Sequence, residues 1–319
     1  MFWRCGSCGS EPWEAYEAAH DGKKVKFLCP VPGYDRHFGI TADLGIENVP
    51  VAMTDNGPDM DEIERLVAAD DSIKGIWCVP KYSNPEGIIY SKDTIVRMAS
   101  MKPAAPDFTI MWDNAYCIHE FDGDYVEFPD ILHQCKKYGN YDMVYEFAST
   151  SKITFPGDGV ACMATSEANL EDFEKWIGIQ TISYDKVNQQ RHVLYLQNRA
   201  HTLKLMKKHA AFMKPKFEAV LSTLDREIAP LEIASWSHPK GGYFVSFDAM
   251  PGTAKRTLAL CKEAGVAMTA AGATFPYGID PNDSNIRIAP SFPPVEDVEK
   301  AIAVFCTCVK MSALEKLGV

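Results

Sequence analysis

The sequence predicts an α/β fold in which helices sandwich a mostly parallel sheet, with a smaller α+β domain towards the C-terminus. Short apolar runs alternate with segments of helical spacing in the first half of the chain, a rhythm typical of parallel sheets covered on both faces. Residues 185–228 contain no glycine and a single proline, which indicates long helices leading to a second domain. We therefore divide the chain into a large domain, 1–205, and an interdomain helix with a small domain, 206–319.

Six apolar segments of strand length in the large domain are bounded by turn residues. They cover residues 25–29, 48–53, 73–79, 108–112, 143–148 and 159–165. Helices are predicted where apolar residues recur every three or four positions. These helices cover residues 12–19, 59–69 and 91–101. Asp59 or Asp61 stands near the start of the second helix, and Ser91 is the expected N-cap of the third.

The second half of the chain is expected to open with one or two long helices, bent or broken near Pro215, because proline removes a helical hydrogen bond. The small domain then has two predicted strands and two predicted helices. The strands cover residues 242–247 and 285–289, and the helices cover 253–264 and 295–314. No internal repeat interrupts this pattern, so two globular domains account for the sequence.

Composition narrows the classes of function. The chain has 319 residues, of which 46% are hydrophobic and 24% charged, as in ordinary globular proteins. A net charge of -11 argues against nucleic acid or an anionic membrane as a partner, and no apolar run approaches the roughly 20 residues that span a bilayer. Ten cysteines, several inside apolar runs, fit reduced thiols and a cytoplasmic location. The pairs Cys5/Cys8 and Cys306/Cys308 lack further ligands at zinc spacing, so we expect no metal site.

Lys152 is the first candidate functional residue. It follows Ser149, Thr150 and Ser151 at the end of the apolar run 143–148, and ligands of open α/β sheets collect at strand ends. A partly desolvated lysine loses its proton readily and attacks carbonyl carbons. The hydroxyl groups beside it can hold a phosphate, so the stretch suggests pyridoxal phosphate, an aldehyde with a phosphate group. The alternative is an exposed lysine in an ordinary turn.

Polar residues also follow two earlier predicted strands: Asn84 after one, and Asp113 with Tyr116 after the next. Parallel strands end at one edge of a sheet, so these side chains are expected to meet Lys152 there. Pyridoxal chemistry needs a carboxylate at the ring nitrogen, donors to the phenolic oxygen and a phosphate holder. Asp113 suits the first role, Tyr116 and Asn84 the second, and Ser149 the third. Taken singly, each residue also fits a turn, a helix cap or the core.

The order of these motifs resembles that of fold-type-I pyridoxal-phosphate aminotransferases. The motifs are Asn84-Pro85-x-Gly87, Asp113-x-x-Tyr116, Ser149-x-x-Lys152 and Arg287 within Asn285-Ile286-Arg287-Ile288-Ala289. Longer segments resemble the type Ic aspartate aminotransferases, a group associated with MocR-like proteins. These segments are residues 81–85, 112–116, 148–155 and 287–291. The similarity runs from about Pro12 to near the C-terminus.

The resemblance implies a role for each matching residue. Lys152 would form the Schiff base with pyridoxal 5'-phosphate and later move the substrate proton. Asp113 would pair with the pyridine nitrogen, and Ser149 would contact the phosphate. Tyr116 and Asn84 would hydrogen-bond the phenolic oxygen.

The resemblance also implies a substrate site and an assembly. Tyr34 falls where relatives place an aromatic ring that stacks on the cofactor. Arg287 would bind the substrate α-carboxylate as a bidentate pair, which lysine cannot reproduce, and Asn84 would also contact the substrate. The segment 240–244 would approach the substrate, its glycines permitting close main-chain contact. The implied reaction is ping-pong amino transfer between aspartate and 2-oxoglutarate, with amino acids and 2-oxo acids as partners, in a homodimer.

Two features depart from the family pattern. Residues 156–160 contain no arginine, whereas relatives often carry a phosphate-binding arginine there. Residues 1–11 do not match the N-terminal segment of relatives, which includes a Gly/Ser turn that grips the phosphate at a helix N-terminus. We therefore expect the chain to be truncated at its N-terminus.

Three alternatives remain beside amino transfer. Another fold-type-I reaction, such as that of a lyase or decarboxylase, would use Arg287 equally well. A truncated, non-catalytic remnant would bind the cofactor weakly or not at all. A MocR-type transcription regulator would need a basic winged-helix module, which the sequence lacks.

Overall fold

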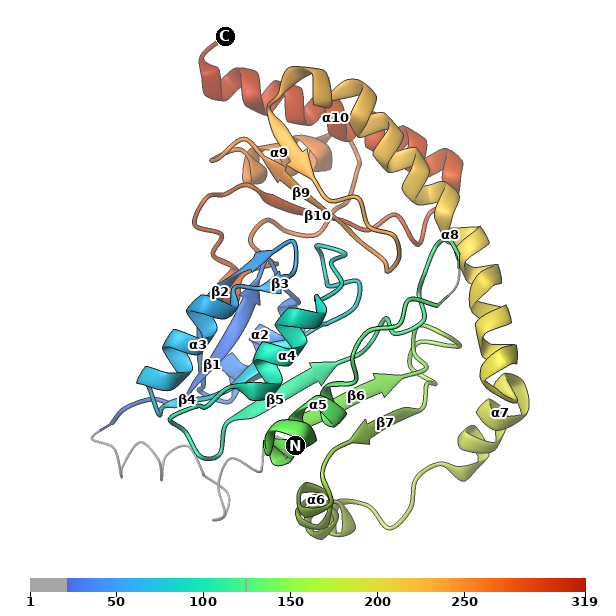
Figure 1. Cartoon of the computed structure of the whole chain (residues 1–319). Helices are drawn as coiled ribbons and strands as arrows, with labels where there is room; N and C mark the ends of the chain where they lie inside the picture. Colours follow the sequence, from blue (N-terminus) through green and yellow to red (C-terminus); the bar gives the residue numbers. More distant parts are fainter. Residues whose placement is uncertain (1–21, 124) are drawn as a thin grey trace.

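Two separate β-sheets, joined by a long helix, organise the chain (Figure 1). The computed structural model describes residues 22–123 and 125–319. The helix expected at 12–19 and the pair Cys5/Cys8 lie outside the described residues. Among the described residues, the predicted strands and helices of both domains are confirmed, with ends shifted by a few positions.

The large sheet has seven strands in the order β3-β2-β1-β4-β5-β6-β7. The strands are β1 (Lys26–Val31), β2 (Glu47–Thr54), β3 (Gly57–Pro58), β4 (Ile73–Cys78), β5 (Thr109–Asp113), β6 (Val144–Ser149) and β7 (Ala161–Ala164). The central strands β2, β1, β4, β5 and β6 are parallel, whereas β3 and β7 pair antiparallel at the two edges. The carboxyl ends of β4, β5 and β6 therefore lie side by side, as the sequence predicts.

Five helices accompany this sheet. They are α2 (Asp35–Asp43), α3 (Met60–Ala69), α4 (Lys92–Ser100), α5 (Ile131–Tyr138) and α6 (Glu167–Gln180). Asp59 caps α3 by accepting from two backbone N–H groups, and Ser91 caps α4 by accepting from Thr94 N. The Ser91 cap was predicted, and Asp59 is one of the two residues expected near the start of α3. The helices α2, α5 and α6 were not predicted. α2 and α5 are short, with 9 and 8 residues, and the single buried residue of α6 is the polar Asn169, so α6 has no buried apolar stripe.

Successive residues of the central strands point to opposite faces of the sheet. Leu28 and Ile110 belong to the core under α3, α4 and α5, whereas Phe27 and Met111 belong to the core on the side of α2. All four side chains are buried, and burying each contributes about 1.5–3 kcal/mol. The two cores hold the strands in register and so fix where their polar ends emerge.

Two helices connect the sheets: α7 (Lys186–Leu196) and α8 (Arg199–Glu227). Of the bend or break predicted near Pro215, the break is wrong, because α8 continues through that residue and the helices separate at Gln197 instead. Gln197 has a positive φ of 58°, and Asn198 then caps α8 by accepting from His201 N. Beyond Pro215 the apolar residues of α8 pack into the small-domain core, which offsets the hydrogen bond that proline removes.

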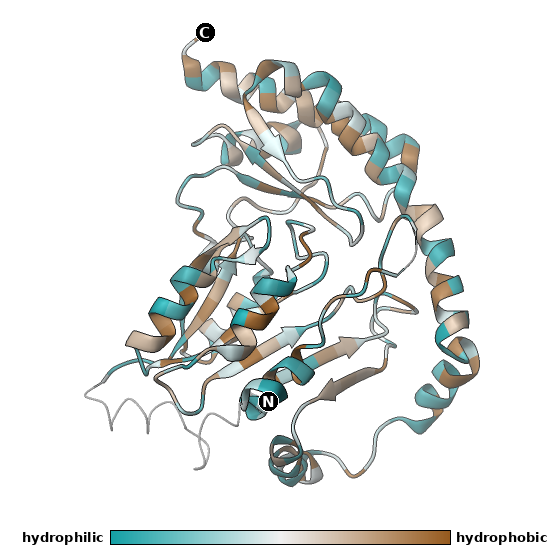
Figure 2. Cartoon of the chain, viewed as in Figure 1, coloured by the Kyte–Doolittle hydropathy of each residue, from teal (hydrophilic) through white to brown (hydrophobic). Residues whose placement is uncertain are grey.

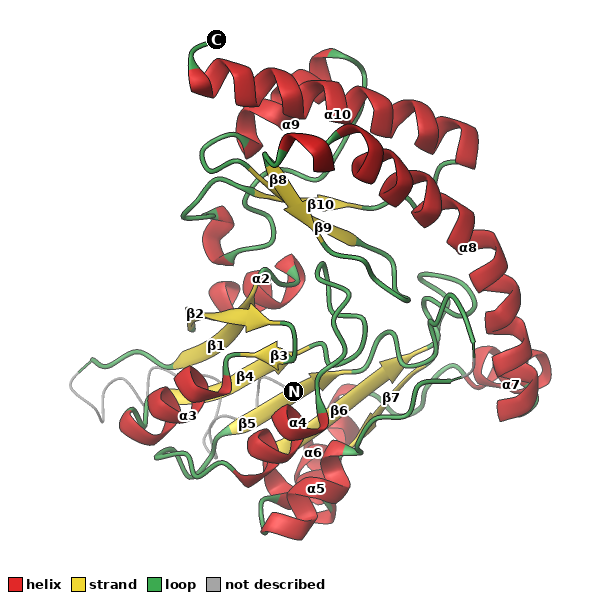
Figure 3. Ribbon diagram, turned by 45° about the horizontal axis from the view of Figure 1, so that its top comes forward, coloured by secondary structure: helices red, strands yellow, loops and turns green. Residues whose placement is uncertain are grey.

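The small domain is an antiparallel sheet covered by helices (Figure 3). Its elements are β8 (Ala234–Trp236), β9 (Val245–Ala249), β10 (Asn285–Ile288), α9 (Ala254–Glu263) and α10 (Val295–Leu317). Phe247 of β9 stacks on Trp236 and meets Phe305 of α10 edge to face, so the sheet and the helix share one core. This core carries β10, and with it Arg287, to the large domain.

Three further properties concern only the described residues. Their eight cysteines are free thiols. None of their helices combines the length and apolar character needed to cross a membrane. They contain no cluster of three or more histidine, cysteine or acidic side chains arranged for a metal ion.

Candidate active site

The parallel strands bring the predicted site residues to one edge of the large sheet. Asp113 ends β5 and pairs in register with Phe147 of β6, two residues before Ser149 ends that strand. Asn114 N donates to Phe147 O at 2.8 Å, which continues the pairing into the loops. Asp113 and Lys152 are close enough that the carboxylate charge acts on the lysine amine.

A histidine fixes the carboxylate of Asp113. His37 Nε2 lies 3.0 Å from Asp113 Oδ2, and the buried His37 ring stacks on Trp77 with centroids 4.2 Å apart. The Tyr34 ring meets His37 edge to face with centroids 5.0 Å apart, so His37 links Tyr34 to Asp113. No role was predicted for His37 from the sequence. Its spacing of one helical turn from Tyr34, at the start of α2, was the available signal.

The Lys152 amine lies over an aromatic ring. Its Nζ atom is 4.8 Å from the centroid of the Tyr116 ring. Burial lowers the pKa of Lys152 from its ordinary value, and the charge of Asp113 opposes this by raising it. The lowered pKa increases the fraction of neutral amine, which is the form that attacks a carbonyl or accepts a proton.

Tyr116 is a hydrogen-bond donor held in its protonated form. The side chain is buried, and burial raises the pKa of its hydroxyl group, with the charge of Asp113 raising it further. The phenol therefore keeps its proton throughout the neutral range. This fits a donor to an oxygen atom of a bound group, as the sequence predicts.

Arg287 comes from the small domain and meets two large-domain residues. Its Nη1 atom donates to Asp35 Oδ1 at 2.9 Å and to Asn84 Oδ1 at 3.3 Å. Its Nε atom is buried and has no hydrogen-bond partner among the described residues. The guanidinium lies 5.1 Å from the centroid of the Phe244 ring. Arg287 therefore retains an unused donor, and Asp35 is a site residue that the sequence analysis missed.

The loop after β6 is held in a fixed conformation. Thr150 N donates to Val160 O at 2.9 Å, and Val160 N donates to Thr150 Oγ1 at 2.9 Å. A Cβ atom on Gly159 would come within 2.9 Å of Ser151 Oγ, so the two segments pack at the closest distance that glycine permits. Ser149 Oγ is 3.4 Å from Ser151 N and half-buried, so the hydroxyl stands at the rim of this loop.

Two more side chains reach the main chain of Lys152. His119 Nε2 and the hydroxyl of Tyr243 each lie 3.2 Å from the carbonyl oxygen of Lys152. Burial lowers the pKa of His119 to about 4, although the hydrogen bond to Lys152 O raises it. His119 is therefore neutral at physiological pH. His119 was not predicted as a site residue, and Tyr243 was predicted only to lie near the substrate.

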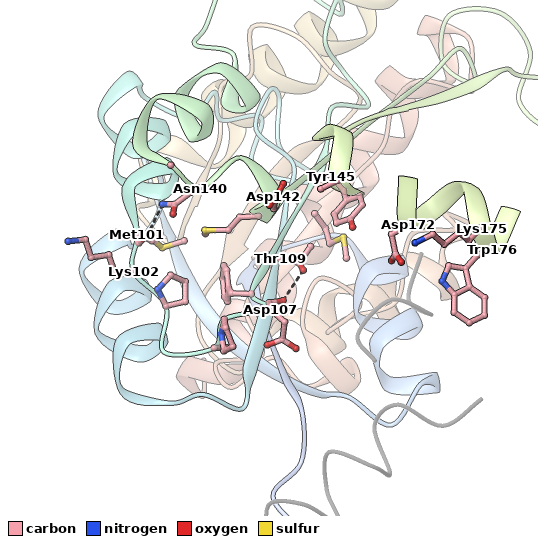
Figure 4. A pocket seen from close by; sticks show the side chains of 18 residues that line it. Met101, Lys102, Asp107, Thr109, Asn140, Asp142, Tyr145, Asp172, Lys175 and Trp176 are labelled. Atoms are coloured by element: carbon pink, nitrogen blue, oxygen red, sulfur yellow. Dashed lines mark hydrogen bonds between the residues drawn. The ribbon is translucent and has the colours of Figure 1, made fainter. Parts of the chain in front are cut away.

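A separate cavity of about 1010 Å³ lies at the opposite edge of the sheet, where β5 and β6 begin (Figure 4). Lys102, Asp107 and Asp142 are among its polar lining, and Asn140 forms one wall by donating to Met101 O at 3.0 Å. Ligands of open α/β sheets bind at the carboxyl ends of the strands. We therefore place the candidate active site at Lys152 and not in this cavity.

Comparison with known proteins identifies relatives along almost the whole chain. A family described as "Aspartate amino-transferase" matches residues 6–319. A protein of Mycolicibacterium smegmatis named as an aminotransferase is 50% identical over 306 residues, which are 96% of this chain and 70% of that protein. The aspartate aminotransferase of Corynebacterium glutamicum is 44% identical over 305 residues, which are 96% of this chain and 69% of that protein.

A solved structure agrees with these matches. The crystal structure of an aspartate transaminase from Corynebacterium glutamicum has a TM-score of 0.92 at 43% identity and covers 98% of this chain and 72% of its own. The fold, with its mostly parallel sheet and helices, is therefore that of the fold-type-I aminotransferases. The chain belongs to the aspartate amino-transferase family and is an aminotransferase.

The lowered pKa of His119 predicts a pH dependence of stability. The unfolded histidine has a pKa near 6.5 and the folded one about 4, so the unfolded state binds more protons between these values. The free energy of unfolding should therefore fall by about 3 kcal/mol through this one group as the pH drops from 7 to 4. Urea unfolding of the parent and of His119→Gln, which cannot titrate, measures the difference. Parallel pH curves for the two proteins would contradict the prediction.

Proposed function

We propose that this chain transfers the amino group of aspartate to 2-oxoglutarate with pyridoxal 5'-phosphate as its cofactor. The observation that carries the proposal is the placement of the Lys152 amine over Tyr116, within reach of the Asp113 charge and on the same rim as Arg287. The 44% identity to a relative named aspartate aminotransferase supports the choice of substrate.

The side chains at the site match what this cofactor requires. Pyridoxal phosphate supplies an aldehyde that bonds amines and an electron-withdrawing ring. Asp113, fixed by its histidine, would hold the ring nitrogen, and Tyr34 would cover the ring. The protonated Tyr116 would donate to the phenolic oxygen, with Asn84 beside it. Ser149, at the end of β6, would contact the phosphate. The Nε atom of Arg287, which has no hydrogen-bond partner among the described residues, leaves a donor for the substrate.

Arg287 would bind and orient the substrate through its α-carboxylate. A planar guanidinium offers two parallel N–H donors to a carboxylate, and this arginine has donors that no described residue uses. Asp35 Oδ1 lies 2.9 Å from Nη1, an ion pair of the kind that a substrate carboxylate would make with this guanidinium. Asn84 supports the same Nη1 atom from the large domain.

Lys152 would move the proton at the substrate α-carbon. Its lowered pKa gives the neutral amine that takes this proton, and the resulting ammonium returns it. The same amine serves the amino acid in one half-reaction and the 2-oxo acid in the other. Asp113 stabilises the ammonium through its charge, because it raises the pKa of Lys152 against the effect of burial.

We further propose that the protein is a cytoplasmic homodimer. Exposed apolar side chains gather along α6, α7 and the segment between them, and Figure 2 shows apolar residues along α7 at the outside of the molecule. These residues are Trp176, Ile179, Ile182, Tyr184, Val187, Val193, Leu194 and Tyr195. Such a concentration of apolar surface is typical of subunit interfaces, and a second copy would bury it. The free thiols fit a reducing compartment.

Replacing Lys152 by alanine tests the proposed function. Without the amine, the parent's visible absorption near roughly 400 nm on addition of pyridoxal phosphate should be absent, and amino transfer should fall by at least about 10³-fold. Lys300→Ala, at an exposed lysine near the start of α10, is the control and should behave as the parent. Full absorption and transfer in the Lys152→Ala protein would refute the assignment.

Replacing Arg287 by lysine tests the substrate role. Lysine keeps the charge but offers no bidentate geometry, so KM should rise by about 10- to 100-fold for both aspartate and 2-oxoglutarate, which share the α-carboxylate. Arg256→Lys is the matched control, because Arg256 pairs with Glu315 at the surface of the small domain. Steady-state kinetics of both variants measure the effect. An unchanged KM for both substrates would exclude Arg287 from the carboxylate site.

A further inference from the structure

Two side chains from different parts of the chain form hydrogen bonds to the carbonyl oxygen of Lys152. His119 lies in the loop after β5, and Tyr243 lies just before β9 of the small domain, yet each places a polar atom 3.2 Å from this oxygen. A carbonyl oxygen only accepts, so both groups must donate. The neutral His119 ring therefore carries its proton on Nε2, and its buried Nδ1 has no hydrogen-bond partner among the described residues.

The same aromatic cluster touches both ends of Lys152. The rings of Tyr116, His119 and Tyr243 pack against one another with centroids 5.6–5.9 Å apart. Tyr116 lies under the Lys152 amine, whereas the other two rings reach its carbonyl. The position of the amine is therefore linked through packed side chains to the hydrogen bonds at the carbonyl.

Main-chain contacts fix Tyr243 to the large domain. Gly242 N donates to His119 O at 3.0 Å, and Phe121 N donates to Lys240 O at 2.9 Å. A Cβ atom on Gly241 would overlap the His119 carbonyl oxygen and the Tyr82 ring, so only glycine fits there. The glycines of this segment permit close main-chain contact with the loop that carries His119, whereas its expected approach to the substrate stays a prediction.

The buried side chain of Lys81 fixes the loop that carries His119. Lys81 Nζ donates to Cys117 O and Val126 O at 2.8 Å each and to Glu120 Oε1 at 2.5 Å. Lys81 is fully buried, and removing one member of a buried charged pair is strongly destabilising. The loop therefore presents His119 to Lys152 in a fixed position.

We propose that His119 and Tyr243 are positioning residues, which hold the peptide carbonyl of Lys152 so that its amine stays over Tyr116, and that Tyr243 transmits the position of the small domain to this lysine. The inference rests on the proposed function of Lys152 as the proton-transferring amine. Neither side chain needs to touch the substrate. Their effect is to reduce the volume that the amine explores, and small displacements of a reacting group cost much of its rate.

Three variants test the proposal kinetically. Tyr243→Phe and His119→Phe keep a ring but remove one donor, and each should lower kcat about 3- to 10-fold while KM for both substrates stays within about twofold. His119→Gln retains an N–H near the position of Nε2 and should recover most of the loss. Tyr82→Phe is the matched control, because the Tyr82 hydroxyl is buried in the same cluster and has no hydrogen-bond partner among the described residues.

A second measurement is independent of turnover. Reductive methylation of cofactor-free protein, followed by peptide mass spectrometry, gives the pH midpoint at which the Lys152 amine becomes reactive. The parent midpoint should lie below the ordinary value of a lysine side chain, about 10.4. Tyr243→Phe and His119→Phe should shift it towards that ordinary value by at least about half a pH unit, because a released backbone lets the amine move towards water.

The two readouts separate the possible failures. A shifted Lys152 midpoint without any amino transfer in the parent would retain the positioning role and reject the proposed function. Normal transfer by the parent, with both phenylalanine variants matching Tyr82→Phe in kcat and in midpoint, would overturn the positioning role alone. Loss of kcat with equal loss in His119→Gln would also contradict it, since the retained donor should rescue.

Discussion

Partial burial of one ammonium group is the constraint on which the rest of the site depends. Taking the Lys152 amine out of water lowers its pKa, and the nearby carboxylate of Asp113 works against this. The structure tolerates the desolvation because the amine lies on the Tyr116 ring, whose hydroxyl stays protonated for the same reason. Burial thus sets two protonation states at once: an amine ready to accept a proton and a phenol ready to donate a hydrogen bond.

The site is assembled from both domains, and the contacts between them are specific. Arg287 of β10 pairs with Asp35 and Asn84 of the large domain, and Tyr243 reaches the carbonyl of Lys152. The small-domain core sets these two side chains through β9 and β10. Any displacement of the small domain would therefore change the guanidinium and the lysine together. Under the proposed function, this arrangement would couple substrate carboxylate binding at Arg287 to placement of the Lys152 amine.

The sequence predicted what depends on local pattern and missed what depends on distant contacts. Asp113 and Lys152 stand where apolar strands end, so alternation and strand length located them. The partners Asp35 and Tyr243 are separated by 252 and 91 residues from Arg287 and Lys152, and no local signal encodes such pairs. The break between the connecting helices was also predicted at the wrong place. Tertiary packing keeps α8 helical beyond Pro215, whereas the positive φ of Gln197 and the cap formed by Asn198 separate α7 from α8.

The central claim is that the amine of Lys152, and no other in the chain, is the one that captures the cofactor aldehyde. Incubation with pyridoxal phosphate at neutral pH, reduction with borohydride and peptide mass spectrometry would test it most directly. We predict one modified site, Lys152, at close to one equivalent per chain. Modification spread over exposed lysines, with Lys152 unlabelled, would contradict the account.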